Sequence, residues 1–312
     1  IIAIGDSGDL VAELILSKEM NTKQFGITPS SLEDTHDLIQ IAINNCDILN
    51  FDSNANYLIN SVLTVHHNTH LKLNGSNLIS TYKHIIYNFV STDTYTGYNG
   101  KGNLTIENGT ITGGCISLIH GKNITIKNIL FNNCINDHCI EICACNNVKV
   151  SRCQFNGCPN PASSFTLHSG INLDPAYHTN FPWLPSTSVM YDHTANSDVY
   201  IEDNTFDMSD NTDESITDLR SVDAHTTLAD DLPLENNNKN IVVTNNNMKL
   251  SRGSNAYLFS CDNVIFANNY VETPRCGVCV AGDKVTVTDN IFVGSGSNQG
   301  SPVWVYGDSQ DL

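Results

Sequence analysis

Basic side chains are scarce in this sequence of 312 residues. Lys and Arg together number 15 against 33 Asp and Glu, so the formal net charge is −18 and the isoelectric point is near 4.7. Proteins that bind nucleic acids need basic patches to contact phosphates, and anionic membrane surfaces attract similar basic clusters. We therefore expect neither a nucleic-acid partner nor a membrane partner.

Long apolar runs are also missing. No stretch reaches the ~18 apolar residues of a membrane-spanning helix. The opening IIAIGDSGDLVAELIL is interrupted by Asp6, Asp9 and Glu13 and lacks a basic start, so it does not match a secretory signal. Because it also lacks an initiator Met, we expect the sequence to be a piece of a longer chain. Hydrophobic residues make up 40% and charged residues 15%, which favours a folded protein over an acidic disordered tail.

The eleven cysteines lack the arrangement of a disulfide framework or a zinc finger. Their number is odd, and the chain is too long for a disulfide-stapled mini-domain. Six of them lie between Cys134 and Cys158, but no CxxC pair is followed by a second pair at finger spacing. A zinc site is the alternative; we expect free, buried thiols that pack as small hydrophobic side chains.

Asparagine, in contrast, is abundant, at 41 residues, and much of it belongs to an internal repeat. Each copy has a polar start, aliphatic residues at positions two and four, Asn, Asp or Arg commonly at six, often Asn at seven, and an apolar residue at nine. The copies are NLTIENGTI (from Asn103), NITIKNILF (Asn123), NVKVSRCQF (Asn147), DVYIEDNTF (Asp198), NIVVTNNNM (Asn240), NVIFANNYV (Asn263) and KVTVTDNIF (Lys284), with HLKLNGSNL (His70) as a fainter first copy.

The spacing and composition of this repeat predict a parallel β-helix. Alternating apolar residues indicate a strand with one buried face, and Asn suits a tight turn because it tolerates left-handed backbone. The starts are separated by 20, 24, 51, 42, 23 and 21 residues, so most units match one coil and two carry long loops. A leucine-rich horseshoe would need a leucine-dense consensus, and a β-sandwich would not give phased copies with an Asn column.

The amino-terminal part predicts a cap for such a coil. Residues 31–46 (SLEDTHDLIQIAINNC) have the pattern of a short helix whose apolar face holds Leu38, Ile39, Ala42 and Ile43. With NYLINSVLTVHHNTHLKLNGSNLIS (56–80) and YNGKGNLTIENGTITG (98–113), this segment resembles the pectate-lyase-like superfamily of right-handed parallel β-helices, which includes bacteriophage tailspikes and polysaccharide depolymerases.

The resemblance covers about residues 31–294 and implies an all-β fold: a right-handed, single-stranded parallel β-helix with a short N-terminal capping helix. Residues 1–30 lie outside the resemblance, and we expect them to form a connector or an N-terminal cap, with residues 31–312 as a catalytic β-helix domain. The resemblance further implies a homotrimer that works outside the cell, on a phage tail or as a secreted bacterial enzyme. The superfamily contains lyases, hydrolases, epimerases and non-catalytic binders, so the resemblance does not fix the reaction.

A second strand in each coil brings acidic residues to one outward face. We align CISLIH, CIEICA, GINLDP, SVDAH, AYLFSC and GVCVAG, with aliphatic residues such as Ile140 and Ile142 pointing inward. The first outward column is then Ser117, Glu141, Asn172, Asp223, Tyr257 and Val278, and the second is Ile119, Cys143, Asp174, His225, Phe259 and Val280. Three carboxylates and a histidine are thus expected on adjacent coils, facing water.

The expected spacing of these acids suits glycoside hydrolysis. Glu141 and Asp174 lie one coil and two residues apart, so strand geometry puts their backbones roughly 8 Å apart. Inverting glycosidases hold their acid and base carboxyls ~6.5–9.5 Å apart, leaving room for a water molecule. The candidate substrate-binding residues beside the acids are His138, Asn172, Tyr177, His178, Trp183, Arg220 and Tyr257. The competing interpretation is that these acids are merely solvated, and that Tyr257 and Phe259 pack on each other.

Several reactions remain open. Hydrolysis is the leading hypothesis, with Glu141 and Asp174 as the pair, Asp223 as an alternative base and His225 orienting Asp174; which carboxyl is the acid stays undecided. No cofactor is needed for that chemistry. A polysaccharide lyase is the runner-up and would need Ca²⁺ held by these carboxylates; a teichoic-acid phosphodiesterase would also need a metal. A tail fibre that binds glycan without cleaving it is the non-enzymatic alternative.

Overall fold

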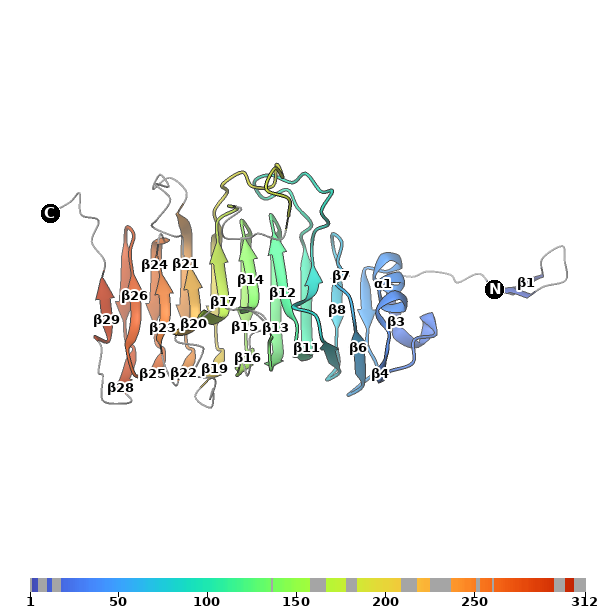
Figure 1. Cartoon of the computed structure of the whole chain (residues 1–312), viewed down its shortest axis with the longest axis horizontal. Helices are drawn as coiled ribbons and strands as arrows, with labels where there is room; N and C mark the ends of the chain where they lie inside the picture. Colours follow the sequence, from blue (N-terminus) through green and yellow to red (C-terminus); the bar gives the residue numbers. More distant parts are fainter. Residues whose placement is uncertain are drawn as a thin grey trace.

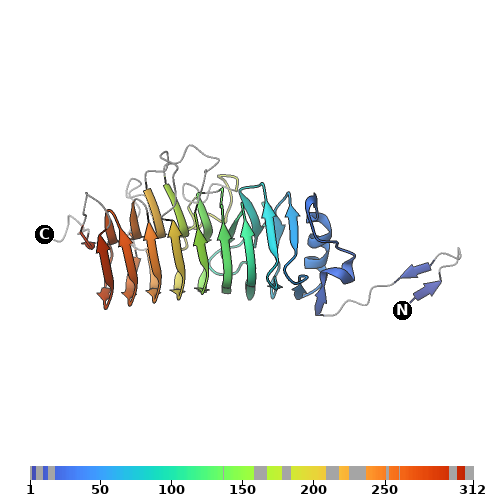
Figure 2. The same ribbon diagram turned by 90° about the horizontal axis from the view of Figure 1, so that it is seen from below.

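The computed structural model describes residues 2–4, 10–12, 18–135, 137–157, 167–177, 184–208, 218–224, 237–250, 253–259, 261–294 and 301–305. Its parallel strands stack as successive turns of one coil, the right-handed parallel β-helix that the repeat and the resemblance predicted. Figure 1 shows the coils side by side along the long axis, and Figure 2 shows the same order from below. No helix in the described ranges is long and apolar enough to cross a membrane.

Three parallel sheets form the walls of the coil. The nine-stranded front sheet has the order β29-β26-β23-β20-β17-β14-β12-β10-β7. Its strands are β7 (Leu63–Thr64), β10 (His84–Tyr87), β12 (Cys115–Ile119), β14 (His138–Cys143), β17 (Leu167–Asp174), β20 (Asp218–Ala224), β23 (Ser254–Leu258), β26 (Cys276–Val280) and β29 (Val303–Val305).

The two back sheets meet at a sharp corner, and two long strands run through both of them. These are β11 (Leu104–Thr112) and β13 (Lys122–Asn132). The first back sheet adds β3 (Glu19–Asn21), β5 (Ile48–Asn50), β8 (His70–Lys72), β15 (Asn146–Ser151), β18 (Ser197–Glu202), β21 (Asn238–Thr244), β24 (Cys261–Ala267) and β27 (Val285–Thr288). The second adds β4 (Ser30–Asp34), β6 (Asn56–Ile59), β9 (Asn77–Ser80), β16 (Gln154–Asn156), β19 (Thr205–Met208), β22 (Asn247–Leu250), β25 (Tyr270–Thr273) and β28 (Ile291–Gly294).

The polar repeat positions form the corners of the coil. In all seven clear copies the residues at positions one and six have positive φ, as at Asn123 (57°) and Asn128 (53°). Asn is the non-glycine residue that best tolerates this left-handed conformation, which explains why the repeat needs it. On the outside, the Asn123 amide donates to Asn103 Oδ1 (2.8 Å) and the Asn128 amide to Asn108 Oδ1 (2.9 Å), so neighbouring corners are tied together.

The asparagines at position seven lie inside the coil. Asn204, Asn246, Asn269 and Asn290 form a ladder. The side-chain oxygens of Asn246, Asn269 and Asn290 each accept from the backbone N–H and the amide of the Asn on the preceding coil, at 2.9–3.0 Å. The Asn204 oxygen accepts from the Cys153 N–H at 2.8 Å. Asn204, Asn246 and Asn269 are no more than 2% exposed. Aromatic stacking fills the same interior: Phe131, Phe155 and Phe206 stack with ring centroids 5.0 and 4.5 Å apart.

The helix α1 (His36–Asn45) packs against one end of the coil, as predicted. Ile39, Ala42 and Ile43 are buried in the core, but Leu38 is 44% exposed, so its assignment to the buried face was wrong. Pairing within the coil begins before residue 31, because β3 pairs with β5 and β4 with β6. The short 3-10 helix η1 (Thr22–Phe25) connects towards β4, and β1 (Ile2–Ile4) pairs antiparallel with β2 (Leu10–Ala12).

The described cysteines are all free, and all except Cys46 are buried. Cys158 lies outside the described residues. In the described part of the chain, no group of three or more His, Cys, Asp or Glu side chains is placed to hold a metal ion, which gives the zinc alternative no support there.

Candidate functional site

The front sheet aligns the acidic residues as the sequence predicted. Glu141 pairs in register with Asn172, and Asn172 pairs with Asp223 on the next coil. Asp174 aligns with Cys143, two residues further along the strands. Their neighbours Ile140, Ile142, Ile171 and Leu173 belong to the hydrophobic core, so the alternating acids point out of the coil.

The expectation that these acids face water is wrong. Glu141, Asp174 and Asp223 are each 0% exposed, as is Asn172 between them. They lie outside the coil wall but beneath other parts of the chain. An open groove with solvated carboxylates is therefore absent, and a polymer can reach these acids only if part of their cover moves.

The three acids surround Asn172 without converging on one point. Strand spacing places the Glu141 and Asp223 backbones each about 8 Å from that of Asp174. The Asn172 amide donates to Asp174 Oδ2 at 2.7 Å. All three acids are described, and they form no group that could share a single metal ion.

Arg220 stabilises negative charge at one side of this cluster. Its Nη1 donates to Asp223 Oδ1 at 2.6 Å, and Arg220 is only 9% exposed. The guanidinium also lies 3.8 Å from the centre of the Tyr257 ring. Tyr257 meets Phe259 edge-on at 3.7 Å between centroids, so the two aromatic residues do pack on each other. The Tyr257 ring is half-buried, and Phe259 is buried.

His138 lies at the edge of the same face. It aligns with Ser169, which in turn aligns with Arg220. His138 Nδ1 is 2.7 Å from Ser169 Oγ. Tyr177 is 6% exposed and stacks on His193 at 4.2 Å between centroids, so it is not an open platform for a sugar. The other two substrate-binding candidates, His178 and Trp183, and the proposed orienting residue His225 lie outside the described residues.

The sequence interpretation missed Tyr87, which ends the acidic column on the opposite side from Tyr257. Tyr87 pairs in register with Ser117, and Ser117 with Glu141. Burial raises the pKa of Tyr87, and the charges of Cys115 and Glu141 raise it further. The strand β10 lies before the first clear copy of the repeat, so the repeat could not place Tyr87. The short apolar segment HIIY is the one sequence signal that could have predicted a strand there.

The last coil departs from the predicted columns. Tyr257 aligns with Cys279 rather than Val278, and Val280 aligns with the core residue Leu258 instead of Phe259. The turn before Lys284 is one residue shorter than its counterparts, and a shift of one residue moves every side chain to the opposite face. The first outward column therefore continues from Tyr257 through Cys279 to Trp304.

The thiols beside the acids are buried, and burial disfavours their nucleophilic thiolate form. Burial raises the pKa of Cys143 well above its usual range, and the nearby charges of Asp174, Cys145 and Glu141 raise it further. Burial likewise raises the pKa of Cys261 to about 12, with smaller contributions from Asp262, Asp223 and Asp174. Protonated thiols are weak nucleophiles.

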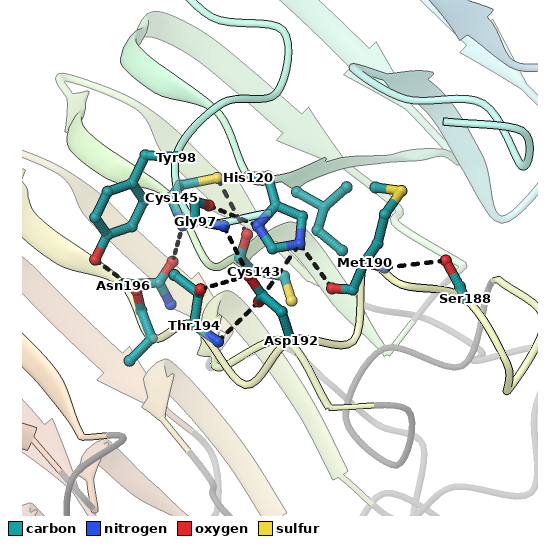
Figure 3. Close-up of polar contacts among 12 residues, drawn as sticks. Gly97, Tyr98, His120, Cys143, Cys145, Ser188, Met190, Asp192, Thr194 and Asn196 are labelled. Carbon is teal, nitrogen blue, oxygen red and sulfur yellow. Dashed lines mark hydrogen bonds and ion pairs between the residues drawn. The ribbon is translucent and has the colours of Figure 1, made fainter. Parts of the chain in front are cut away.

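Residues 184–196 form the described part of the chain that covers this face, here called the cover, and His120 holds them in place by hydrogen bonds (Figure 3). His120 is fully buried; its Nδ1 lies 2.6 Å from the Gly97 carbonyl oxygen and its Nε2 lies 2.7 Å from that of Met190. Asp192 Oδ2 accepts from the Gly97 N–H at 2.7 Å. Residues 184–196 are thereby tied to the loop that holds Gly97.

The fastened segment packs beside the acids. Leu184 and Met190 pack with Cys143, Ala144 and Ala176 in a hydrophobic cluster outside the main core. Cys143 is the register neighbour of Asp174. Residues 184–196 therefore shield the Asp174 side of the acidic cluster.

His84, which lies on β10 two strands before Glu141 in the front sheet, should make the fold sensitive to mild acid. Burial, with a smaller effect of Lys83, lowers the pKa of His84 from 6.5 to about 4. Between those pH values the unfolded chain binds the extra proton, so stability is complete above pH 6.5 and falls as the pH drops towards 4. We expect the free energy of unfolding to decrease by about 3 kcal/mol over this window.

Denaturant unfolding at a series of pH values measures this effect. His84→Gln should lose this contribution to the pH dependence while retaining the part due to carboxylates. An unchanged slope in the variant would contradict the assignment to His84.

The described surface also has a hollow on a different face. It lies on the second back sheet and is lined by Asn245, Asn246, Asn247, Lys249, Asn268 and Tyr270. It is not above the acids, so it does not provide access to them.

Comparisons with known proteins find similarity in structure but not in sequence. No protein-family model matches the chain, and no curated protein matches it. PfbA, a surface adhesin of Streptococcus pneumoniae, aligns with a TM-score of 0.56 at 15% identity, covering 91% of each chain. ORF18 of Geobacillus virus E2 aligns with a TM-score of 0.54 at 15% identity, covering 92% of this chain and 59% of the viral one. At these identities the two structures show a shared fold.

Proposed function

We propose that the chain is a polysaccharide depolymerase that hydrolyses a bacterial surface or extracellular glycan at its front sheet. The observation that carries the proposal is the alignment of Glu141, Asn172 and Asp223, with Asp174 diagonal to both acids. The tyrosines Tyr87 and Tyr257 lie at the two ends of this polar column. Carboxyls between aromatic rings are suited to bind sugar hydroxyls and faces and to catalyse proton transfer.

In the proposed reaction, Glu141 and Asp174 form the pair. One carboxylic acid protonates the leaving glycosidic oxygen, while the other, as carboxylate, takes a proton from the attacking water. The Asn172 amide favours the charged form of Asp174 by donating to it, which suits Asp174 as the base and Glu141 as the acid. Arg220 similarly favours charge on Asp223, which keeps Asp223 as the alternative base.

Because the acids are buried, the proposal requires the cover to open when glycan binds. The cover includes residues 184–196. Asn196 is anchored in the coil wall by hydrogen bonds to the carbonyls of Ile142 and Asp174, so opening would displace only residues 184–195. These residues are held by His120, Gly97 and Tyr98 on one side and by Ala176 on the other. Closure over a bound sugar would then exclude bulk water from the carboxyls. No cofactor is needed for this hydrolysis.

One digestion experiment tests the class of reaction. The protein is incubated with a panel of bacterial exopolysaccharides and cell-wall polymers, and the products are read by mass spectrometry and ultraviolet absorbance. Hydrolysis gives new reducing ends without an unsaturated product. An absorbing unsaturated sugar would instead identify a lyase, and release of phosphorylated polyol units would identify teichoic-acid cleavage.

The burial of the acids favours one competing function, glycan binding without cleavage. Fully covered carboxyls are compatible with a structural role, and PfbA, which shares the fold, is described as a surface adhesin. Retention of a glycan on the immobilised protein, with no product of either kind, would select this function.

The proposal also includes where the protein acts and how it assembles. We propose that it acts outside the cell, on a phage tail or as a secreted protein, and that it assembles as a homotrimer. Light scattering of the purified protein measures the assembly.

A further inference from the structure

We propose that the hollow on the second back sheet is a separate binding site for a neutral saccharide unit. Its volume of about 480 Å³ is in the range of small-molecule sites, ~300–1,000 Å³. It opens to solvent at the corner where β22 and β25 begin. Only the choice of a saccharide as ligand rests on the proposed function; the site stands on its own residues and does not require cleavage.

The floor of the hollow is rigid. Asn246 belongs to the buried ladder: its oxygen accepts from Asn204, and its amide donates to Ile201, Thr244 and Asn269. It is 2% exposed. A preformed floor lowers the entropic cost of ordering a binding site.

The rim carries amides that the fold leaves unused. Within the described part of the chain, the side chains of Asn245 and Asn268 make no hydrogen bond. The Asn247 Oδ1 atom also has no partner, but it is buried, so the rim depends on Asn245 and Asn268. The equivalent corner residues Asn108 and Asn128 pair with each other instead. An Asn amide offers both a donor and an acceptor, which is the combination that vicinal sugar hydroxyls need.

Tyr270 supplies the apolar contact. It pairs in register with Asn247 and is half-exposed at the wall of the hollow. A tyrosine ring beside amide groups presents an apolar face and polar partners together, which matches the two-sided character of a pyranose ring.

The charges around the hollow favour a neutral ligand. Lys249 is the cation at its wall, and it lies in register between Asp207 and Glu272. Two carboxylates flank one ammonium group, so no net positive charge is available to select a phosphate or a uronic acid.

Side-chain amide signals in nitrogen-15 NMR spectra test this site directly. The probes are the methyl pyranosides of glucose, galactose and N-acetylglucosamine at millimolar concentration, with methyl glucuronide and inorganic phosphate for comparison. We expect the neutral glycosides to shift the amide signals of Asn245, Asn247 and Asn268. Tyr270→Ala should weaken this binding about tenfold. Tyr200→Ala, at a tyrosine that is 37% exposed on the neighbouring sheet, should leave it unchanged.

A second variant keeps the test independent of any local disturbance by Tyr270→Ala. Asn268→Gly retains the positive φ of 55° and removes only the amide, and Asn128→Gly is its matched control at a distant corner. Binding should weaken in the first variant and persist in the second. The inference is overturned by the absence of shifts with every neutral glycoside, by equal shifts in Tyr270→Ala, or by shifts with phosphate or glucuronide alone. Cleavage by the Tyr270→Ala variant reports separately on the proposed function, and we expect it to be unchanged.

Discussion

Replacing Glu141 by Gln is expected to lower kcat for glycan cleavage by about 10³-fold while glycan binding persists. The change keeps the size of the side chain and removes the acidic proton that the leaving oxygen needs, and proton transfer by a positioned group contributes ~10²–10⁴-fold to rate. Release of reducing ends measures the loss, and retention of oligosaccharide measures the binding.

Glu202→Gln is the matched control for this variant. Glu202 points outward from the first back sheet, where it forms an ion pair with Lys149, so its replacement tests the same chemical change away from the front sheet. It should leave cleavage unchanged. Activity of Glu141→Gln within a few fold of the unmodified protein would remove Glu141 from the mechanism.

The remaining two acids need different treatment. Asp174→Asn removes the carboxylate to which the Asn172 amide donates, and its effect on kcat reports on the proposed base. Asp223→Asn would leave the buried Arg220 without its counter-charge, and such a loss destabilises the fold by itself. The double variant Arg220→Met with Asp223→Asn avoids that imbalance and separates catalysis from stability.

Asn246→Ala is expected to destabilise the fold by about 3–5 kcal/mol, the largest stability effect among the repeat asparagines. The substitution removes the oxygen that accepts from both the backbone and the side chain of Asn204. It also leaves the carbonyl of Ile201 without its amide donor inside the coil. Buried groups that lose their partners retain the full cost of desolvation.

Asn263→Gly tests whether the loss of stability in Asn246→Ala comes from the burial of that asparagine or would follow at any asparagine of the repeat. The Asn263 amide donates to Asn240 Oδ1 at 2.7 Å on the exposed outer ladder, and Gly keeps its positive φ of 55°. We expect a loss below about 1 kcal/mol, because water replaces the broken bond. Equal losses for the two variants, measured by denaturant unfolding, would contradict the role assigned to the buried ladder.

The sequence predicted the coil because its signals are local. Each corner needs a residue that tolerates positive φ, so Asn, Asp, Lys or Arg recurs at the same phase, as at Asn240 and Lys284. The alternation of apolar and polar residues along each strand indicates which side chains point into the coil. These two constraints were sufficient to place Glu141, Asn172 and Asp223 in one column. The prediction that Val278 points outward was wrong. The turn before Lys284 is one residue shorter than in the other coils, which moves each side chain of the strand to the opposite face. The repeat pattern begins after that turn, so it does not show the difference.

The environment of the acids could not be predicted in the same way. Whether Glu141 faces water depends on where long segments between the coils fold, and those segments carry no phased pattern. His120, which is far from Met190 in sequence, fastens part of the cover through a backbone carbonyl, and any residue type could supply that oxygen. Tyr87 was missed for a related reason, since its strand precedes the first clear repeat.

A crystal structure of Glu141→Gln with a bound oligosaccharide product or substrate tests the central claim most directly. We expect sugar density along the front sheet between Tyr87 and Tyr257, with the glycosidic oxygen within hydrogen-bond distance of residue 141. We also expect residues 184–195 to be displaced from their position beside Asp174. Sugar bound only elsewhere on the coil, with Asp174 and Asp223 still fully covered, would contradict the assignment of this acidic cluster as the functional centre.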